Sequence, residues 1–112
     1  MYREEQANLG LANVLSSMGD LERKQSNYQV SIRHYENAFH LYDIEKEPMG
    51  KSYLLGELCR IYALAERTDD ALKTLQQTRI AFDQMPENVR PYVAGCIKEA
   101  AELLGITNTE SP

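Results

Sequence analysis

Apolar residues recur every three or four positions along most of this chain, which is the spacing of helices that bury one face. Residues 1–25, 28–44, 49–65, 68–82 and 93–104 each carry this pattern, and no segment alternates apolar and polar residues as a strand does. In the first segment the predicted buried stripe consists of Leu11, Val14, Leu15, Met18 and Leu21. The pattern therefore predicts an all-α protein of about five helices.

Turn-forming residues separate the predicted helices. Asn27 is a candidate N-cap of the second helix and Thr68 of the fourth, because short side chains with an oxygen accept hydrogen bonds from free backbone amides. Pro48 predicts a stop after the second helix, since proline lacks the backbone donor that continues a helix. Gly105 is placed to end the fifth helix, as glycine often does at a helix C-terminus.

The sequence contains an internal repeat with a period of about 40 residues. The first two predicted helices then fall on the third and fourth, with apolar residues on apolar residues and turn on turn. Paired positions include Gly10 with Gly50, Leu15 with Leu55, Met18 with Leu58, Leu21 with Ile61, Ile32 with Leu72 and Tyr35 with Leu75. A further shift of similar length places Tyr53 on Tyr92 and Gly56 on Gly95. The sequence thus predicts one helical hairpin repeated about two and a half times.

These repeated positions resemble the signature of the tetratricopeptide repeat (TPR) family, in which large and small residues take fixed places on two helices. The first repeat carries it as Leu15, Met18, Gly19, Ser31, Tyr35 and Ala38, and the second as Leu55, Leu58, Cys59, Tyr62, Ala71 and Leu75. Glu22 stands where the family has an aromatic residue, and Thr78 where it has alanine. The repeat of about 40 residues resembles the longer variants of a family whose usual unit has about 34.

The resemblance implies antiparallel helical hairpins stacked as a short TPR-like α-solenoid. Residues 1–106 would form a single domain, with a first repeat at about 8–47, a second at about 48–85 and a terminal helix at about 86–105. Residues 107–112 would follow this domain as a polar tail.

In TPR-like stacks the first helix of each hairpin lines a concave surface, so the resemblance also implies a binding face. Carried over position by position, that face consists of Asn13, Ser16, Asp20, Tyr53, Gly56, Arg60, Tyr92, Gly95 and Glu99. Tyrosine rings offer flat amphipathic surface, and glycines leave room for a ligand backbone. The same residues are equally consistent with close packing of neighbouring helices, and the sequence leaves both interpretations open. With Arg60 as its one strong cation, the face does not match the carboxylate clamp of the chaperone-tail receptors in this family.

Composition narrows the kinds of partner. The 112 residues have a formal net charge of -5, whereas proteins that bind a nucleic-acid backbone usually present a basic patch. No stretch of about 18 apolar residues is present that would span a membrane. Cys59 and Cys96 lie far apart in a chain without a secretory signal, which predicts reduced thiols in the cytoplasm. We therefore expect another protein or a peptide as the partner, with no nucleic acid and no membrane.

Candidate catalytic and metal-binding side chains lack partners at a useful spacing. On a helix His34 and His40 point about 120° apart, and neither has a histidine or cysteine at metal-ligand spacing. Cys59 occupies the small-residue position of the repeat, which favours a buried packing thiol, whereas Cys96 beside Gly95 is open to either interpretation. Phosphate-binding loops and nucleophile motifs are missing from the sequence. We predict no catalytic residue, no metal, no cofactor and no enzyme activity.

Two alternatives remain beside a peptide-binding module or scaffold. Repeat stacks usually need about three repeats with polar ends, and the predicted repeats fall short of that number. The fifth predicted helix is apolar on several sides, through Val93, Ile97, Leu103 and Leu104, so a homo-oligomer formed through this terminal helix is the first alternative. The second is a regulatory or sensory fragment of a longer TPR array.

Overall fold

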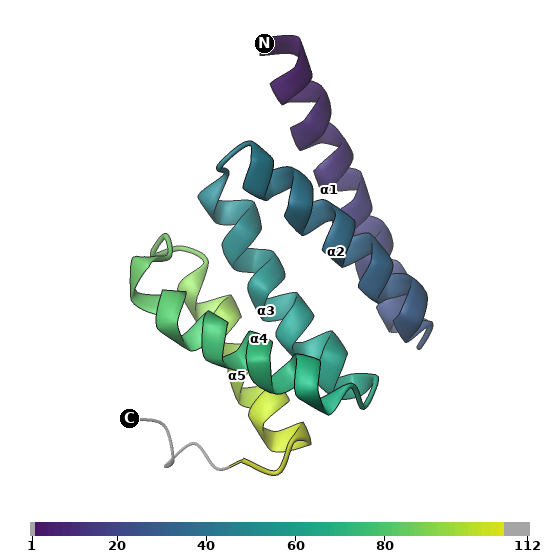
Figure 1. Cartoon of the computed structure of the whole chain (residues 1–112), viewed down its shortest axis with the longest axis vertical. Coiled ribbons are helices and arrows are strands. Elements are labelled where there is room, and N and C mark those ends of the chain that lie inside the picture. Colours follow the sequence, from purple (N-terminus) through teal and green to yellow (C-terminus); the bar gives the residue numbers. More distant parts are fainter. Residues whose placement is uncertain (1, 107–112) are drawn as a thin grey trace.

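The computed structural model describes residues 2–106, and all regular structure in that range is helical (Figure 1). The helices are α1 (Tyr2–Lys24), α2 (Tyr28–Ile44), α3 (Pro48–Leu64), α4 (Thr68–Ala81) and α5 (Arg90–Leu103), with a short 3-10 helix, η1 (Phe82–Gln84), after α4. The prediction of an all-α chain with five helices is confirmed. None of the described helices combines the length and the apolar character needed to cross a bilayer. The predicted tail, 107–112, lies outside the described residues.

Two of the predicted helix starts differ in detail from the structure. Asn27 is the N-cap of α2, but its side chain makes no capping bond and donates instead to Glu22 Oε1 at 2.8 Å. Thr68 is the first residue of α4, so the prediction that it caps this helix is wrong and the N-cap is Arg67.

Pro48 separates two helices by starting the second of them. It is the first residue of α3, a position where the missing amide removes no helix hydrogen bond. The Glu47 carboxylate caps this helix by accepting a hydrogen bond of 2.9 Å from the Met49 amide.

The first three turns between helices share one backbone geometry. Ser26, Lys46 and Glu66 each take the left-handed conformation, with φ of 64°, 54° and 60°. In each turn the next amide bonds back into the preceding helix, as the Asn27 amide does to the Glu22 carbonyl at 2.8 Å. This is the Schellman motif, which satisfies carbonyls at a helix end. The repeated sequence therefore has a repeated turn as its structural counterpart.

Glycine at these three turn positions should stabilise the protein. An L-residue in the left-handed conformation costs about 1–2 kcal/mol, and glycine avoids this cost. Glycine also loses more chain entropy on folding than other residues do, which cancels part of the gain. We expect Ser26→Gly, Lys46→Gly and Glu66→Gly each to raise the free energy of unfolding by about 0.5–1 kcal/mol in urea denaturation. Gln25→Gly is the control, because Gln25 does not have a positive φ. A gain of equal size at Gln25 would contradict the backbone explanation.

The helices pack in the order in which they follow one another, and α3 is the central helix. α2 lies between α1 and α3, while α3 also packs against α4 and α5 (Figure 1). The side chains of Leu54, Cys59 and Ile61 on α3 are fully buried. α1 is the longest helix, with 23 residues, and its start extends past the end of α2, where residues 3–7 are all exposed.

Small residues allow close approach between neighbouring helices. A Cβ atom at Gly19 would lie 2.6 Å from the Tyr35 ring, and one at Gly56 would lie 3.3 Å from the Cys96 sulfur. The Ser31 hydroxyl donates to the Gly19 carbonyl at 2.8 Å, which fixes α2 against α1. These contacts explain the sizes of the side chains at three of the repeated positions.

The predicted buried stripe of α1 is wrong. Four of its five side chains are largely exposed, at 51% for Leu11, 54% for Val14, 41% for Met18 and 54% for Leu21, and Leu15 alone is half-buried. α1 buries its small residues instead, namely Ala12, Ser16 and Gly19. Small side chains let α2 come close, and this leaves the large apolar side chains facing outward. We call Leu11, Val14, Met18 and Leu21 the α1 stripe.

Candidate functional site

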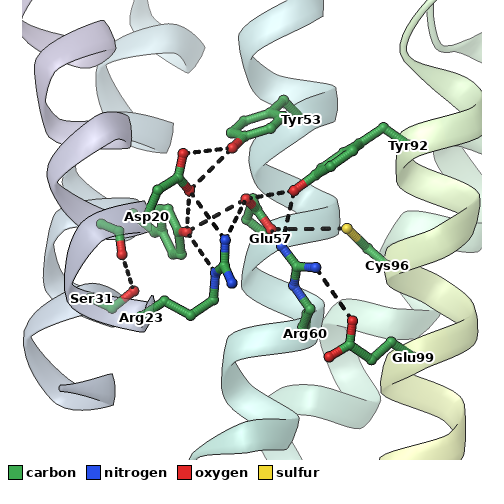
Figure 2. A network of polar contacts seen from close by, with 11 residues as sticks. Asp20, Arg23, Ser31, Tyr53, Glu57, Arg60, Tyr92, Cys96 and Glu99 are labelled. Atoms are coloured by element: carbon green, nitrogen blue, oxygen red, sulfur yellow. Dashed lines mark hydrogen bonds and ion pairs between the residues drawn. The ribbon is translucent and has the colours of Figure 1, made fainter. Parts of the chain in front are cut away.

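A network of polar side chains connects α1, α3 and α5, with Glu57 of α3 at its centre (Figure 2). The Glu57 side chain is fully buried. Its carboxylate forms an ion pair with Arg60, one turn later on α3, and lies 4.0 Å from the Arg23 guanidinium of α1. It also accepts a hydrogen bond of 2.9 Å from the Tyr92 hydroxyl of α5. A buried charge is tolerated when it is paired and hydrogen-bonded, so these partners explain how Glu57 can occupy the core.

Arg60 joins α3 to α5. Its guanidinium donates to the Glu99 carboxylate at 3.3 Å and to the Tyr92 hydroxyl at 2.9 Å. The guanidinium carbon also lies 5.8 Å from the centroid of the Tyr92 ring, within the range of a cation–π contact. Burial lowers the pKa of Arg60, but Glu57, Cys96 and Tyr92 together more than offset this and the net pKa is raised. Arg60 is therefore a permanent cation held between two acids.

Asp20 organises the α1 side of the network. Its carboxylate accepts hydrogen bonds from the hydroxyl of Tyr35 on α2 and from that of Tyr53 on α3, the latter at 2.9 Å. The Arg23 guanidinium lies 4.0 Å from the same carboxylate. Tyr53 stacks on Tyr92 with ring centroids 5.2 Å apart. Aromatic contact thus continues the network from α1 to α5.

The charges of this network are satisfied within it. Two cations, Arg23 and Arg60, face three acids, Asp20, Glu57 and Glu99, and each has a partner of opposite sign within 4.0 Å. An anionic ligand would have to displace an acid from Arg23 or Arg60. The network therefore serves mainly to hold three helices in register.

Burial and the Glu57 carboxylate raise the pKa of the three tyrosines that surround it. The pKa of Tyr92 rises to about 12, and those of Tyr35 and Tyr53 are also raised. The phenols consequently remain protonated near neutral pH and act as hydrogen-bond donors to carboxylates.

Both cysteines are buried thiols. Burial, followed by the neighbouring Cys96, raises the pKa of Cys59 to about 12. Burial also raises the pKa of Cys96 to about 11. Because the thiolate is the reactive form, these groups have little nucleophilic character near neutral pH. Cys59 is buried as the repeat position predicts, and Cys96 is buried with it.

The structure brings most of the predicted binding-face residues together, but it leaves few of them open to solvent. Asp20, Tyr53, Arg60, Tyr92 and Glu99 belong to the network. Ser16 and Gly56 are buried, and Gly56 packs closely against Cys96 of α5. Asn13, Tyr92 and Gly95 are exposed, and a Cβ atom at Gly95 would meet nothing within 4 Å.

A hollow of about 420 Å³ lies beside the network, between α1 and the first half of α3. Its lining includes Asn13, Ser16, Ser17, Asp20, Glu47 and Tyr53. The Ser16 hydroxyl oxygen is buried and has no hydrogen bond of acceptable geometry. The nearby Tyr42 hydroxyl, which also lies at the hollow, donates its proton to Asn13 Oδ1. We call this feature the α1–α3 hollow.

The α1 stripe borders this hollow. Asn13 and Ser17 line both the hollow and a shallower depression formed with Val14, Met18 and Leu21. A polar recess and an apolar helix face therefore form one continuous surface along α1.

A second hollow of about 490 Å³ lies on another part of the surface, where α2, α3 and the end of α4 meet. Lys46, Lys51 and Gln77 are among its lining residues, and Lys51 is already paired with Asp43 at 2.8 Å. Within residues 2–106, no buried unpaired polar atom lines it. It therefore offers less to a specific ligand than the α1–α3 hollow does.

Sequence reasoning missed Glu57, Arg23, Ser17 and Glu47. Glu57 had a signal, because it is a lone acid between Leu55 and Leu58 in the most apolar stretch of the third helix. An acid at such a position requires a buried cation, and Arg60 at the next turn is the natural partner. The other three had no signal, since each is an ordinary polar residue on a helix surface or in a turn.

In the part of the chain that the structure describes, no three or more histidine, cysteine, aspartate or glutamate side chains are grouped so that they could hold a metal ion. Comparisons with protein-family models, with curated proteins and with solved structures find no match to this chain.

Proposed function

We propose that the chain is a protein–protein interaction module, or scaffold, that binds a peptide or helix of a partner protein on the face formed by α1, α3 and α5. In this proposal the fold is a short TPR-like stack of helical hairpins. The repeated turns and the contact of Gly19 with Tyr35 support such an arrangement. The partner is a protein and not a nucleic acid, in keeping with the net charge of -5.

The observation that carries the proposal is the continuous surface of the α1–α3 hollow and the α1 stripe. Large exposed apolar side chains that run along one helix are typical of a surface that another helix covers. The adjacent hollow adds polar groups that can fix the orientation of a bound segment. A helix that binds another protein uses apolar side chains spaced three or four residues apart, and the α1 stripe presents apolar side chains at the same spacing.

The network itself supports a binding function over a catalytic one. Its acids and cations are paired with one another, and its tyrosines and thiols are protonated near neutral pH. We propose that the protein is not an enzyme and needs no cofactor, and that the network instead gives the binding face a rigid base.

A peptide selection tests this function. Random peptides of about 20 residues, long enough for a helix of about 30 Å, are selected on the intact immobilised chain. The affinity of selected peptides is then measured by fluorescence anisotropy. We expect Ser17→Trp to weaken binding about tenfold or more, because the indole fills the surface where the hollow meets the stripe. Ser17 is exposed, so this variant should keep its helicity.

Gln76→Trp is the matched control. Gln76 is exposed on α4, and the same bulky side chain there should leave the affinity unchanged. Peptides whose affinity falls with Gln76→Trp and not with Ser17→Trp would place binding elsewhere and would contradict the proposal.

A second candidate function is self-association, in which another copy of the chain covers the α1 stripe. The positions on α3 that correspond to Val14, Met18 and Leu21 are Leu54, Leu58 and Ile61, and all three are buried. Because α1 repeats this pattern, we expect its stripe to be buried by another helix. In a regulatory fragment of a longer TPR array, a preceding hairpin would do so.

Light scattering distinguishes self-association through α1 from the terminal-helix dimer that the sequence suggests. α5 buries Val93, Cys96, Ala100 and Ala101, and Leu103 is 49% exposed. If copies meet through the stripe, Met18→Lys should give a monomer and Leu103→Lys should not. The reverse result would place the contact at α5, and a monomer at all concentrations would remove this candidate.

A further inference from the structure

We propose that the α1–α3 hollow receives the positively charged side chain of an arginine or lysine of the partner segment. This inference rests on the proposed function and adds the chemistry of the residue that is recognised. The observations behind it are the charge of the hollow, an unpaired buried hydroxyl and the aromatic walls.

The charge of the lining is negative. Asp20 and Glu47 are its two acids, and no lysine, arginine or histidine lines it. Arg23 approaches Asp20 to 4.0 Å, but the same guanidinium is also 4.0 Å from Glu57 and is shared between them. Glu47 uses Oε2 to cap α3, which leaves its other carboxylate oxygen for a further donor. A cation in the hollow would therefore meet two carboxylates.

The neutral polar groups of the hollow are suited to a donor-rich ligand. Ser16 Oγ is buried beside the Tyr42 hydroxyl and has no hydrogen bond of acceptable geometry, which is costly unless a ligand or a water molecule supplies a partner. The Ser17 hydroxyl is exposed at the rim. Hydroxyl and carboxylate oxygens accept hydrogen bonds, whereas guanidinium and ammonium groups only donate them. The hollow thus offers acceptors at the places where such a head group has donors.

Aromatic and apolar walls complete the match. Tyr42, Tyr53 and Met49 also line the hollow, beside its polar groups. Tyrosine faces attract cations, and apolar walls accommodate the methylene stem of arginine or lysine. The apolar surface of Val14 and Met18 lies directly beside the hollow. The favoured partner is consequently an amphipathic helix that carries a basic residue next to its apolar face.

A pair of small probes tests the inference on the intact chain. N-acetyl-arginine amide is titrated into the isotope-labelled protein, and amide chemical shifts are followed by NMR. N-acetyl-citrulline amide, which has nearly the same shape without the charge, is the matched control. We expect the arginine probe to shift residues 13–20 and Tyr53, with a dissociation constant on the order of millimolar, and the citrulline probe to bind at least about tenfold more weakly. Equal shifts from both probes, or no shifts at these residues, would overturn the inference.

A substitution at the rim gives a second readout. Ser17→Lys places a competing cation at the hollow and should abolish the shifts caused by the arginine probe. Gln76→Lys adds the same charge on the exposed side of α4, away from the hollow, and should leave the shifts intact. Equal effects of the two variants would show that the position of the added cation does not matter, and would overturn the inference.

The failure of the inference can be told apart from the failure of the proposed function. In a selected peptide, each arginine is replaced by citrulline and each lysine by norleucine. If the affinity still falls with Ser17→Trp but does not depend on these replacements, the protein binds peptides on this face and the hollow does not recognise a positive charge. If Ser17→Trp has no effect on any selected peptide, the proposed function itself fails.

Discussion

Glu57→Ala should lower the free energy of unfolding by about 3–5 kcal/mol, the usual cost of removing one partner of a buried ion pair. The substitution leaves Arg60 with Glu99 alone and removes the acceptor of the Tyr92 hydroxyl. Alanine is the best helix former, so local helix propensity cannot explain a loss of this size. Urea denaturation followed by circular dichroism measures the change.

Glu99→Ala is the matched control for this substitution. Glu99 also pairs with Arg60, but its side chain is 44% exposed, and exposed ion pairs contribute less than about 1 kcal/mol. We therefore expect a small loss at Glu99 beside a large one at Glu57. Similar losses at the two positions would mean that burial of Glu57 is not what makes the network important.

Gly19→Ala should lower the free energy of unfolding by about 1–3 kcal/mol, because the added methyl group overpacks the contact between α1 and α2. The new Cβ atom would lie 2.6 Å from the Tyr35 ring. That ring is fully buried, and its hydroxyl is held by Asp20, so it has little freedom to move away. A thermal melt should show the loss directly.

Gly10→Ala separates this effect from helix propensity. A Cβ atom at Gly10 meets nothing within 4 Å, and alanine in an open helix position is favoured over glycine by about 0.5–1 kcal/mol. The same substitution on the same helix should therefore stabilise at Gly10 and destabilise at Gly19. A gain at both positions would contradict the packing of Tyr35 against α1.

The helices could be predicted from the sequence because periodicity and turn residues report local structure. The first turn lies at Ser26 and Asn27, as the sequence predicts. Its left-handed backbone at Ser26 could not be predicted from the residue type. The predicted N-cap of α4, Thr68, lies one residue after the actual N-cap, Arg67, since the start of a helix depends on backbone angles that many residues can adopt.

The burial of α1 could not be predicted in the same way. The helix has two candidate faces, one with large apolar side chains and one with small residues such as Ala12 and Gly19. Hydrophobicity favours burial of the first face, whereas the close approach of α2 selects the second. That choice depends on the partner helix, which a local pattern does not contain.

Part of the candidate site could be predicted from the sequence. The repeat placed Asp20, Arg60 and Glu99 on one face, and all three do meet in the polar network. The hollow was not foreseen, because it forms where the middle of α1 lies beside the start of α3 and depends on Glu47 in the turn between helices. Only the packing of two hairpins against each other creates it.

We propose that a partner segment binds along α1 and the first half of α3, and an NMR map of the bound state tests this most directly. A peptide selected on the intact chain is titrated into the isotope-labelled protein, and amide shifts are followed to saturation. We predict that the largest shifts cluster in residues 13–21 and 49–57. Shifts confined to the exposed sides of α2 and α4, with the α1–α3 hollow unchanged, would contradict this account.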